Sequence, residues 1–574
     1  MKYFLLSFAS ALALASLSSC KSNEVPQQDI MARPTIMCAP PLSDADWYTD
    51  DTPAPLFAGM DILNYPITTK SAEAQKYFNQ GLLLAYGFNH AEAGRSFYEA
   101  TRRDSTCAMC YWGYAYVLGP NYNAGMEPDN YQRAYTAIQK ALKLSGKSTP
   151  KEKALITAMS ARYVKDPVED RRALDSAYMV AMKAVYEQFP TDVDIAAMYA
   201  ESLMDMHPWD LWDKKGNPKS WTPAIIAAIE NAIRVNPKHP GGHHFYIHAV
   251  EASNTPERAL ASCKVFDDGL VPNSGHLVHM PSHIYIHTGD YHKGSVANIK
   301  AVQIDSNYVT QCHAQGAYPL VYYPHNYHFL AACATMEGDS KWAIIAANKM
   351  ADQTNHKGML VAPLMTLQHF NSIPYFVQVK FGKWKEILHQ GPPDSVLLYV
   401  TAVYHYAQGM AYVGTKNFEK AKQELSALQA IAKEDTLKKS LIWGINSMFQ
   451  VTDIAQKVLE GELMAAQGHY DESIKILREA VALEVQLLYQ EPSDWFFSVR
   501  HNLGSVLLAS KKPDAAITIY EEDLKFYPKN GWALNGLKAA YDALKETDKA
   551  KQVDEQFKAA WANADVALVN SVVK

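Results

Sequence analysis

The sequence predicts an all-α protein built from helical hairpins that stack into one long array. Ala, Leu, Tyr and Met recur at the spacing of one helix face, and the alternating runs typical of strands are rare. A pattern that begins with glycine recurs along the chain at matching offsets. With 574 residues, the chain is also far too long for one compact core.

The hairpin pattern is clearest in four segments. The first begins at Gly81 and has Ala93, Phe97 and Ala100 at offsets of 12, 16 and 19 residues. The offsets recur at Gly461, Ser473, Leu477 and Ala480, at Gly409, Ala421, Leu425 and Leu428, and, for the first three positions, at Gly504, Ala516 and Tyr520. Small residues at the crossing points let paired helices approach closely, while the large residue fills the space to the next hairpin.

This pattern resembles the tetratricopeptide repeat family, whose period is about 34 residues. The resemblance covers most of the chain from about residue 75 to about residue 560, although several loops are longer and the consensus proline is often missing. After Gly536, Asp548 stands where a small residue is expected. The resemblance implies a right-handed superhelical solenoid of hairpins, with an irregular helical bundle as the alternative.

The N-terminus has the pattern of a secretory signal. An apolar stretch from Phe4 to Leu17 is too short for a comfortable membrane span and leads into Leu17-Ser18-Ser19-Cys20. That tetrapeptide resembles the lipobox of bacterial lipoproteins, which implies acylation of Cys20 and cleavage before it. We therefore expect a lipid anchor in the cell envelope, at the outer membrane of a diderm bacterium. An ordinary cleaved signal with a chance cysteine is the alternative.

The chain divides into six expected segments. They are a signal peptide at 1–19, a lipidated tether and irregular segment at 20–70, an N-terminal array at 71–206, a long loop at 207–222, central histidine-rich repeats at 223–355 and a C-terminal array at 356–574. The net charge of −6, without any run rich in Lys and Arg, gives no footprint for nucleic acid. We expect no nucleic-acid partner.

Histidines are concentrated in the central repeats. Twelve of the 20 histidines lie between His239 and His328, and the sequences HFYIH at 244–248 and HIYIH at 283–287 are near copies. Four of them would share one stripe of a continuous helix, at His276, His279, His283 and His287. Pro281 interrupts this stripe, and a helix that begins there would keep only His283 and His287 on its face.

The family resemblance places these histidines, with His244, His248, His325 and His328, on first helices that line a concave groove. Two histidines at i and i+4 can bind one metal ion, and Glu251 adds a carboxylate. The cofactor would be a transition metal, Zn, Cu, Fe or Ni. Two alternatives need no metal: buried histidines bonded to neighbouring tyrosines, or an aromatic groove for an organic or peptide ligand.

Two further pairs are candidates for chemistry. Glu201 and Asp205 are four residues apart on one helix, and they could act as hard ligands or as a general base. Cys107 and Cys110 form a CxxC motif that is either a structural thiol pair, a local disulfide or a redox pair. The signatures GxSxG, HExxH and the phosphate-binding glycine loop are missing from the sequence.

The leading functional hypothesis is a cell-envelope binding or scaffold protein that takes a protein or peptide ligand in a histidine-lined groove. One alternative is a metal-dependent enzyme or a metal carrier that uses the histidines of the central repeats. Another is an outer-membrane lipoprotein for nutrient uptake, since Lys21-Ser22-Asn23-Glu24 partly matches a surface-export tag.

Overall fold

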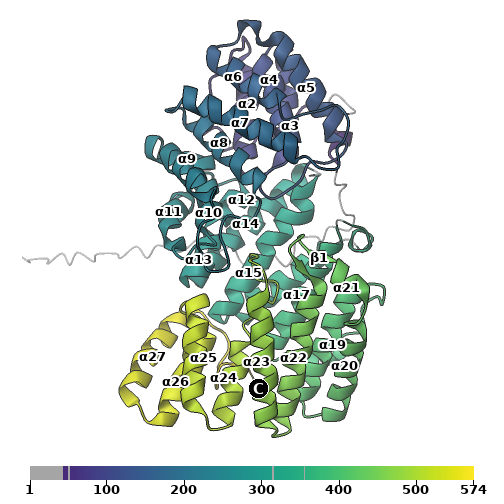
Figure 1. Ribbon diagram of the computed structural model, residues 1–574, viewed down its shortest axis with the longest axis vertical. Coiled ribbons are helices and arrows are strands. Elements are labelled where there is room, and N and C mark those ends of the chain that lie inside the picture. The colour runs from purple at the N-terminus through teal and green to yellow at the C-terminus, as the bar shows by residue number, and fades with distance from the viewer. Residues whose placement is uncertain are drawn as a thin grey trace, which may run out of the picture.

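The structure is a computed structural model that describes residues 43–48, 52–312, 314, 316–354, 356–362 and 364–573. In these residues it is an all-α protein, as predicted (Figure 1). The strands of the described chain, β1 (Leu441–Ile442) and β2 (Asn446–Ser447), form one short antiparallel hairpin. The predicted signal peptide, the anchor at Cys20 and the tether as far as residue 42 lie outside the described residues.

The first part of the chain forms the upper array in Figure 1. Its helices are α2 (Ala72–Tyr86), α3 (His90–Arg103), α4 (Ala108–Leu118), α5 (Asn130–Leu144), α6 (Pro150–Ser160), α7 (Arg172–Gln188), α8 (Val193–Met206) and α9 (Thr222–Val235), with the 3₁₀ helices η1 (Ala45–Tyr48) and η2 (Ser145–Lys147). The predicted long loop is present, and it connects α8 to α9.

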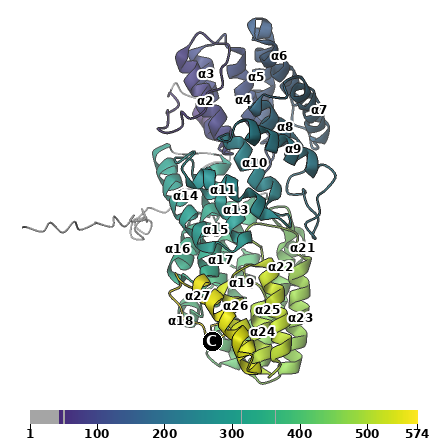
Figure 2. The same ribbon diagram turned by 90° about the vertical axis from the view of Figure 1, so that its left-hand side faces the viewer.

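The central part contains most of the histidines. It consists of α10 (Pro240–Val250), the 3₁₀ helix η3 (Pro256–Ala259), α11 (Leu260–Asp267), α12 (Gly275–His279), α13 (Pro281–Thr288), α14 (Tyr291–Cys312), the π-helical turn η4 (Tyr318–Tyr322), α15 (Tyr323–Glu337) and α16 (Ser340–Asp352). In both ribbon views it lies between the upper and the lower array (Figures 1 and 2).

The C-terminal part forms the lower array (Figure 2). Its elements are the 3₁₀ helices η5 (Gly358–Leu360) and η6 (Leu364–Thr366), then α17 (Leu367–Lys380), α18 (Trp384–His389), α19 (Leu398–Gly414), α20 (Phe418–Ile431), α21 (Asp435–Lys439), α22 (Met448–Ala466), α23 (Tyr470–Gln486), α24 (Arg500–Ala509), α25 (Pro513–Phe526), α26 (Gly531–Leu544) and α27 (Thr547–Ala560).

The predicted hairpins coincide with consecutive helix pairs. They are α2 with α3, α19 with α20, α22 with α23, α24 with α25, and α26 with α27. In two of these pairs, the second helix starts at an asparagine cap. Asn89 and Asn417 accept hydrogen bonds from the backbone N–H groups of Glu92 and Lys420, which satisfies a free donor at each helix start.

Glycine at the crossing points allows the close packing that the pattern predicted. A Cβ atom on Gly461 would lie 2.7 Å from the side chain of Leu477, which is the large residue at offset 16. Gly504 and Gly536 both lie against Tyr520, where added Cβ atoms would come within 2.4 and 2.3 Å of its side chain. The fully buried Tyr520 ring therefore fills the space that the two glycines leave.

The apolar side chains form two cores. One contains buried residues from Ala54 to Tyr322, and the other contains buried residues from Ile286 to Val553. The two ranges overlap between residues 286 and 322, so the histidine-rich segment lies where the cores meet. The 207–222 loop connects two helices of the same core.

Among the described helices, none has both the length and the apolar character that a membrane span requires.

Replacing Gly504 by Ala should lower the midpoint of thermal unfolding. The new methyl group would press on a buried ring that Gly536 also contacts, and such overpacking costs about 1–3 kcal/mol. Gly146→Ala is the control, because a Cβ atom there has no neighbour within 4 Å. Circular dichroism of both variants measures the effect, and equal midpoints for the two would contradict this account of the packing.

Candidate metal centre

Six histidines from four helices converge in the interior at the junction of the two cores. The ligand atoms of His244, His248 and His276 all lie within 4.8 Å of one another, and so do those of His279, His283 and His325. We call the first set triad A and the second set triad B, and together they form the histidine centre. Helix α10 supplies two members, α12 two, α13 one and α15 one.

Local sequence explains how α10 reaches its position. Pro240 begins the helix with the backbone angle that the first turn needs, and His239 caps the start by accepting a hydrogen bond from the N–H of Gly242. A Cβ atom on Gly241 would lie 2.6 Å from the Tyr86 ring. Glycine therefore lets α10 approach α2 closely enough for His244 Nδ1 to bond the carbonyl oxygen of Tyr86, at 2.6 Å.

Pro281 divides the predicted stripe without separating its histidines. It begins α13, as one of the two sequence alternatives expected, and α12 ends just before it. Met280 keeps right-handed helical angles between the two helices, with φ −50° and ψ −37°. His276 and His279 therefore lie on a helical turn of their own, and His283 still reaches the same interior space.

The Nδ1 atoms of four imidazoles are held by hydrogen-bond acceptors. His244 bonds the Tyr86 carbonyl, and His279 bonds Asn298 Oδ1 at 2.8 Å. Glu251 bonds one ring of each triad, with 2.9 Å from Oε1 to His248 Nδ1 and 2.5 Å from Oε2 to His283 Nδ1. Because each acceptor needs a proton on Nδ1, the Nε2 atoms of these four rings carry lone pairs.

The Nε2 atoms face one another at the distances found between ligands of one metal ion. Those of His279 and His283 are 2.9 Å apart, and those of His244 and His276 are 3.1 Å apart. Two nitrogens that lie about 2.0–2.1 Å from one ion are separated by about 2.9 Å at a right angle and by about 3.4 Å at the tetrahedral angle.

The His279 and His283 pair is the more informative of the two. Both Nδ1 atoms donate, so two lone pairs meet with no proton between them. The buried Nε2 of His248 also has no partner within the described structure. A buried lone pair without a donor is unfavourable, and a bound cation would relieve both cases.

Burial disfavours the protonated form of five of the six imidazoles. It lowers the pKa values of five imidazoles below the ordinary histidine value, and neighbouring imidazoles lower them further: His244, His276, His279, His283 and His325. Neutral imidazole is the form that binds a metal ion, so protons compete weakly for these rings.

These residues do not line the open groove that the sequence led us to expect. Triad A and the α12–α13 members of triad B are at most 2% exposed, and only His325 is half-buried. Aromatic rings surround them. The ring centroids of Phe88 and His244 are 4.4 Å apart, and so are those of Phe329 and His283. The imidazoles pack inside the protein because the helices that carry them are covered on every side.

Two predicted ligands lie elsewhere. His287 Nε2 is 2.6 Å from Glu491 and 3.1 Å from the Tyr489 hydroxyl, because it follows His283 by one helical turn and points past the centre. His328 stacks on Phe496 and packs against His369, in the C-terminal core. Neither belongs to a potential metal set in the described part of the chain, whereas Glu251 forms one with His248 and His283 and bonds one ring of each triad.

The sequence did not single out the residues that orient the rings. Tyr86 acts through its backbone carbonyl, and Asn298 lies on α14, 19 residues after His279. A backbone acceptor leaves no side-chain signal, and a lone asparagine on a helix has many ordinary roles.

The other candidate pairs form separate structures. The Glu201 carboxylate accepts a hydrogen bond from the Tyr116 hydroxyl, and Asp205 forms a buried ion pair with Arg162 at 2.7 Å. Neither belongs to a potential metal set among the described residues.

The two thiols of the CxxC motif are free and buried. The Cys107 sulfur caps α4 by accepting a hydrogen bond from the N–H of Cys110, at 3.2 Å. The hydrogen bond between the Cys110 thiol and Cys107, together with burial, raises the pKa of the Cys110 thiol. This arrangement favours the structural alternative, because redox activity needs a thiolate.

Comparisons with known proteins give only distant similarities. No family profile matches the chain, and no curated protein matches it. The human IFIT1 dimer with m7Gppp-AAAA is 14% identical, over 87% of this chain and 92% of that chain, with a TM-score of 0.32. The APC/C hetero-tetramer Cut9-Hcn1 is 15% identical over 84% and 79%, with a TM-score of 0.31, and yeast Tom70 is 12% identical over 84% and 96%, with 0.29. Such weak similarity assigns no function.

Histidines buried outside the triads should make the protein sensitive to acid. Burial lowers the pKa of His369 to about 3, whereas an unfolded histidine titrates near about 6.5. Its contribution to stability is therefore complete above pH 6.5 and falls as the pH drops toward 3. In His369→Gln, the loss of stability between pH 7 and pH 5 should be smaller by about 2 kcal/mol. Urea unfolding at both pH values measures this, and an equal loss in both proteins would contradict it.

Proposed function

We propose that this chain is a transition-metal protein whose histidine centre holds two ions, one in each triad. The observation that carries the proposal is the Nε2 pair of His279 and His283, where two lone pairs face each other at 2.9 Å while both Nδ1 atoms donate elsewhere. A cation between these nitrogens turns a repulsive contact into a pair of metal–ligand bonds. Protonation is the less favourable remedy, because the site is buried.

Two ions fit the arrangement better than one. Each triad has its own closely spaced Nε2 pair, and its third ring lies within the same 4.8 Å. Glu251 is not needed as a ligand, since its two oxygens accept hydrogen bonds from one ring of each triad. Such carboxylate–histidine–metal contacts fix the tautomer and raise the basicity of the ring. The same carboxylate also offsets part of the positive charge of the ions.

The donor set narrows the choice of metal. Six neutral imidazoles suit copper and zinc, whereas Mg, Ca and Mn prefer oxygen ligands and the common iron triad includes a carboxylate ligand. Among Zn, Cu, Fe and Ni, the arrangement favours Cu or Zn. Three protein ligands per ion leave a coordination position for a reactant, as in catalytic rather than structural sites.

Burial favours a resident centre over a carrier. A carrier must release its ion, while here aromatic rings enclose both triads. A cavity of about 80 Å³ reaches the wall of triad A, where Phe88 and Tyr322 line it and also contact His276. A cavity of this volume has room for a small reactant only. We therefore favour a metal-dependent enzyme that acts on a very small reactant.

The envelope location and the lipid anchor remain proposals. They rest on the lipobox-like Leu17-Ser18-Ser19-Cys20 and not on the histidine centre. A protein or peptide ligand for the array, or a role in nutrient uptake, would need a surface other than the buried imidazoles.

Metal content tests the two-ion proposal. Metal-free protein loaded with excess Zn²⁺ or Cu²⁺ and then desalted should retain two equivalents by elemental analysis. The double variants His244→Gln with His276→Gln, and His279→Gln with His283→Gln, should each retain one. His328→Gln is the matched control, a buried histidine outside the triads that should leave both ions in place. An empty wild type, or equal losses in the control, would overturn the proposal, and circular dichroism verifies the fold of each variant.

Glu251→Gln tests the role of the shared carboxylate. The amide has one oxygen and one NH₂ group, so it can accept from only one of the two Nδ1–H groups. The other ring must change its tautomer and lose its Nε2 lone pair, and we expect about 10- to 100-fold weaker affinity for one ion. The control is Glu491→Gln, which changes the buried partner of His287 outside the centre. Competition with a chelator measures both affinities, and an unchanged Glu251→Gln affinity would contradict the assignment.

A further inference from the structure

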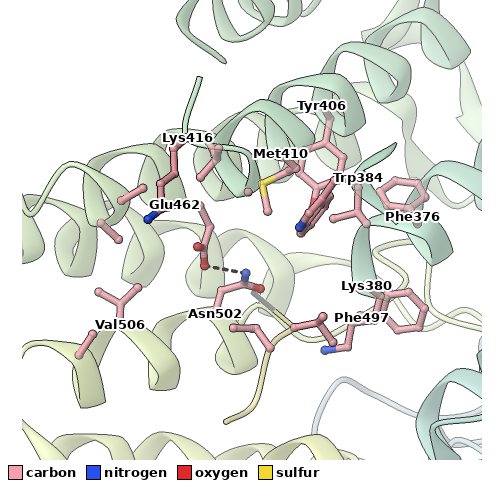
Figure 3. A pocket seen from close by; sticks show the side chains of 18 of the residues that line it. Phe376, Lys380, Trp384, Tyr406, Met410, Lys416, Glu462, Phe497, Asn502 and Val506 are labelled. Carbon is pink, nitrogen blue, oxygen red and sulfur yellow. Dashed lines mark hydrogen bonds between the residues drawn. The ribbon is translucent and has the colours of Figure 1, made fainter. Parts of the chain in front are cut away.

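A second site lies in the lower array, away from the histidine centre. A cavity of about 550 Å³ opens between α17, α19, α22 and α24, which is within the range of about 300–1,000 Å³ usual for small-molecule sites (Figure 3). Its walls are mainly aromatic and aliphatic, including Phe376, Trp384, Tyr406, Met410 and Phe497. Such walls favour a ligand with an apolar body.

Lys380 brings one cationic group into this apolar surrounding. It lies at the end of α17 and lines the cavity beside Phe497 (Figure 3). Its Nζ atom is 2.8 Å from His501 Nδ1 and 3.9 Å from the ring centroid of the fully buried Trp532. Burial lowers the pKa of Lys380 to about 7.

The partners of Lys380 fix the direction of its hydrogen bond. His501 Nε2 lies 2.9 Å from Asp523, which also accepts a hydrogen bond from Asn530 at 3.0 Å. Burial acts to raise the pKa of Asp523, but His501 and these hydrogen bonds hold it below the ordinary value. The carboxylate therefore accepts from His501 Nε2–H, and Nδ1 is left as an acceptor for the Lys380 amine.

The Lys380 ammonium group lacks a direct anionic partner within the described chain. An ammonium has three N–H donors, and its hydrogen bond in the structure is the one to His501. The carboxylate of Asp523 lies behind the imidazole ring. Glu462, which also lines the cavity, accepts a hydrogen bond from Asn502 at 2.8 Å instead (Figure 3).

We propose that this cavity binds an amphipathic carboxylate, with the carboxylate on the Lys380 amine and an alkyl or aromatic body along the aromatic walls. Charge complementarity carries the assignment, since an anion supplies the partner that the buried amine lacks, and charge-assisted bonds in such surroundings are strong. The apolar body displaces water from the rest of the cavity. The proposal stands independently of the metal centre.

The site also contacts the end of the chain. Val572 and Val573 line the cavity, and the buried Ser571 hydroxyl donates to the carbonyl of His501 at 2.6 Å. Residues 571–573 thus form one wall of the cavity, close to the backbone of His501, which is the hydrogen-bond partner of Lys380. A ligand therefore lies between the first helix of the lower array and the last described residues.

The test compares two probes of equal length, dodecanoate and dodecanol, by calorimetric titration below their aggregation concentrations. Wild-type protein should bind dodecanoate at least tenfold more tightly than dodecanol. In Lys380→Met, dodecanoate should weaken by at least tenfold, while dodecanol should bind as in the wild type. Lys433→Met is the control, because Lys433 is exposed to solvent and does not line the cavity, and it should change neither affinity.

Three results would overturn the proposal. The first is that dodecanoate does not bind to the wild type. The second is that the wild type binds dodecanoate and dodecanol with equal affinity. This comparison needs no variant, so a folding defect cannot affect it. The third is an equal loss in Lys380→Met and Lys433→Met, which would indicate a general effect of charge rather than a bond to the buried amine.

Discussion

One buried carboxylate sets the geometry of the histidine centre. Glu251 is 1% exposed, and each of its oxygens bonds the Nδ1 of a different triad. Because a buried acid is costly unless its acceptors are satisfied, this position forces His248 and His283 to turn their rings toward it. Their Nε2 atoms then point away from Glu251 into the interior. The orientation of one ring in each triad therefore follows from where this carboxylate is buried.

The scaffold explains why such a cluster can be assembled at all. Stacked hairpins bring successive first helices side by side, so histidines separated by as many as 81 residues, from His244 to His325, meet in one place. Close approach is required as well, and Gly241 supplies it for α10 against α2. Since the centre lies where two cores meet, a bound ion would connect elements of both and would stabilise the folded state by mass action.

Much of this architecture could be predicted from the sequence, because it depends on short-range patterns. Glycine spacing predicted the hairpins and even the partner of Gly461, since a small residue facing a large one is a local steric rule. The near-copied HFYIH and HIYIH segments contain three of the six convergent histidines, His244, His248 and His283, but they also contain His287, which packs elsewhere. A spacing of four residues places two rings on the same face of a helix. Which of the two rings reaches the histidine centre depends on where that helix lies in the fold, and the spacing does not give this.

What could not be predicted depends on contacts between distant segments. The fate of His328 was decided by Phe496, which comes from a part of the chain 168 residues away. The groove-lining expectation assumed that first helices of the repeats face open space, whereas here neighbouring helices and aromatic rings cover them. Burial changes how an imidazole ring can titrate. A ring in a solvent-filled groove exchanges protons freely, while a buried ring must remain neutral or share a cation. The difference between a binding groove and a metal centre therefore lies in solvent exclusion, which a histidine pattern alone does not encode.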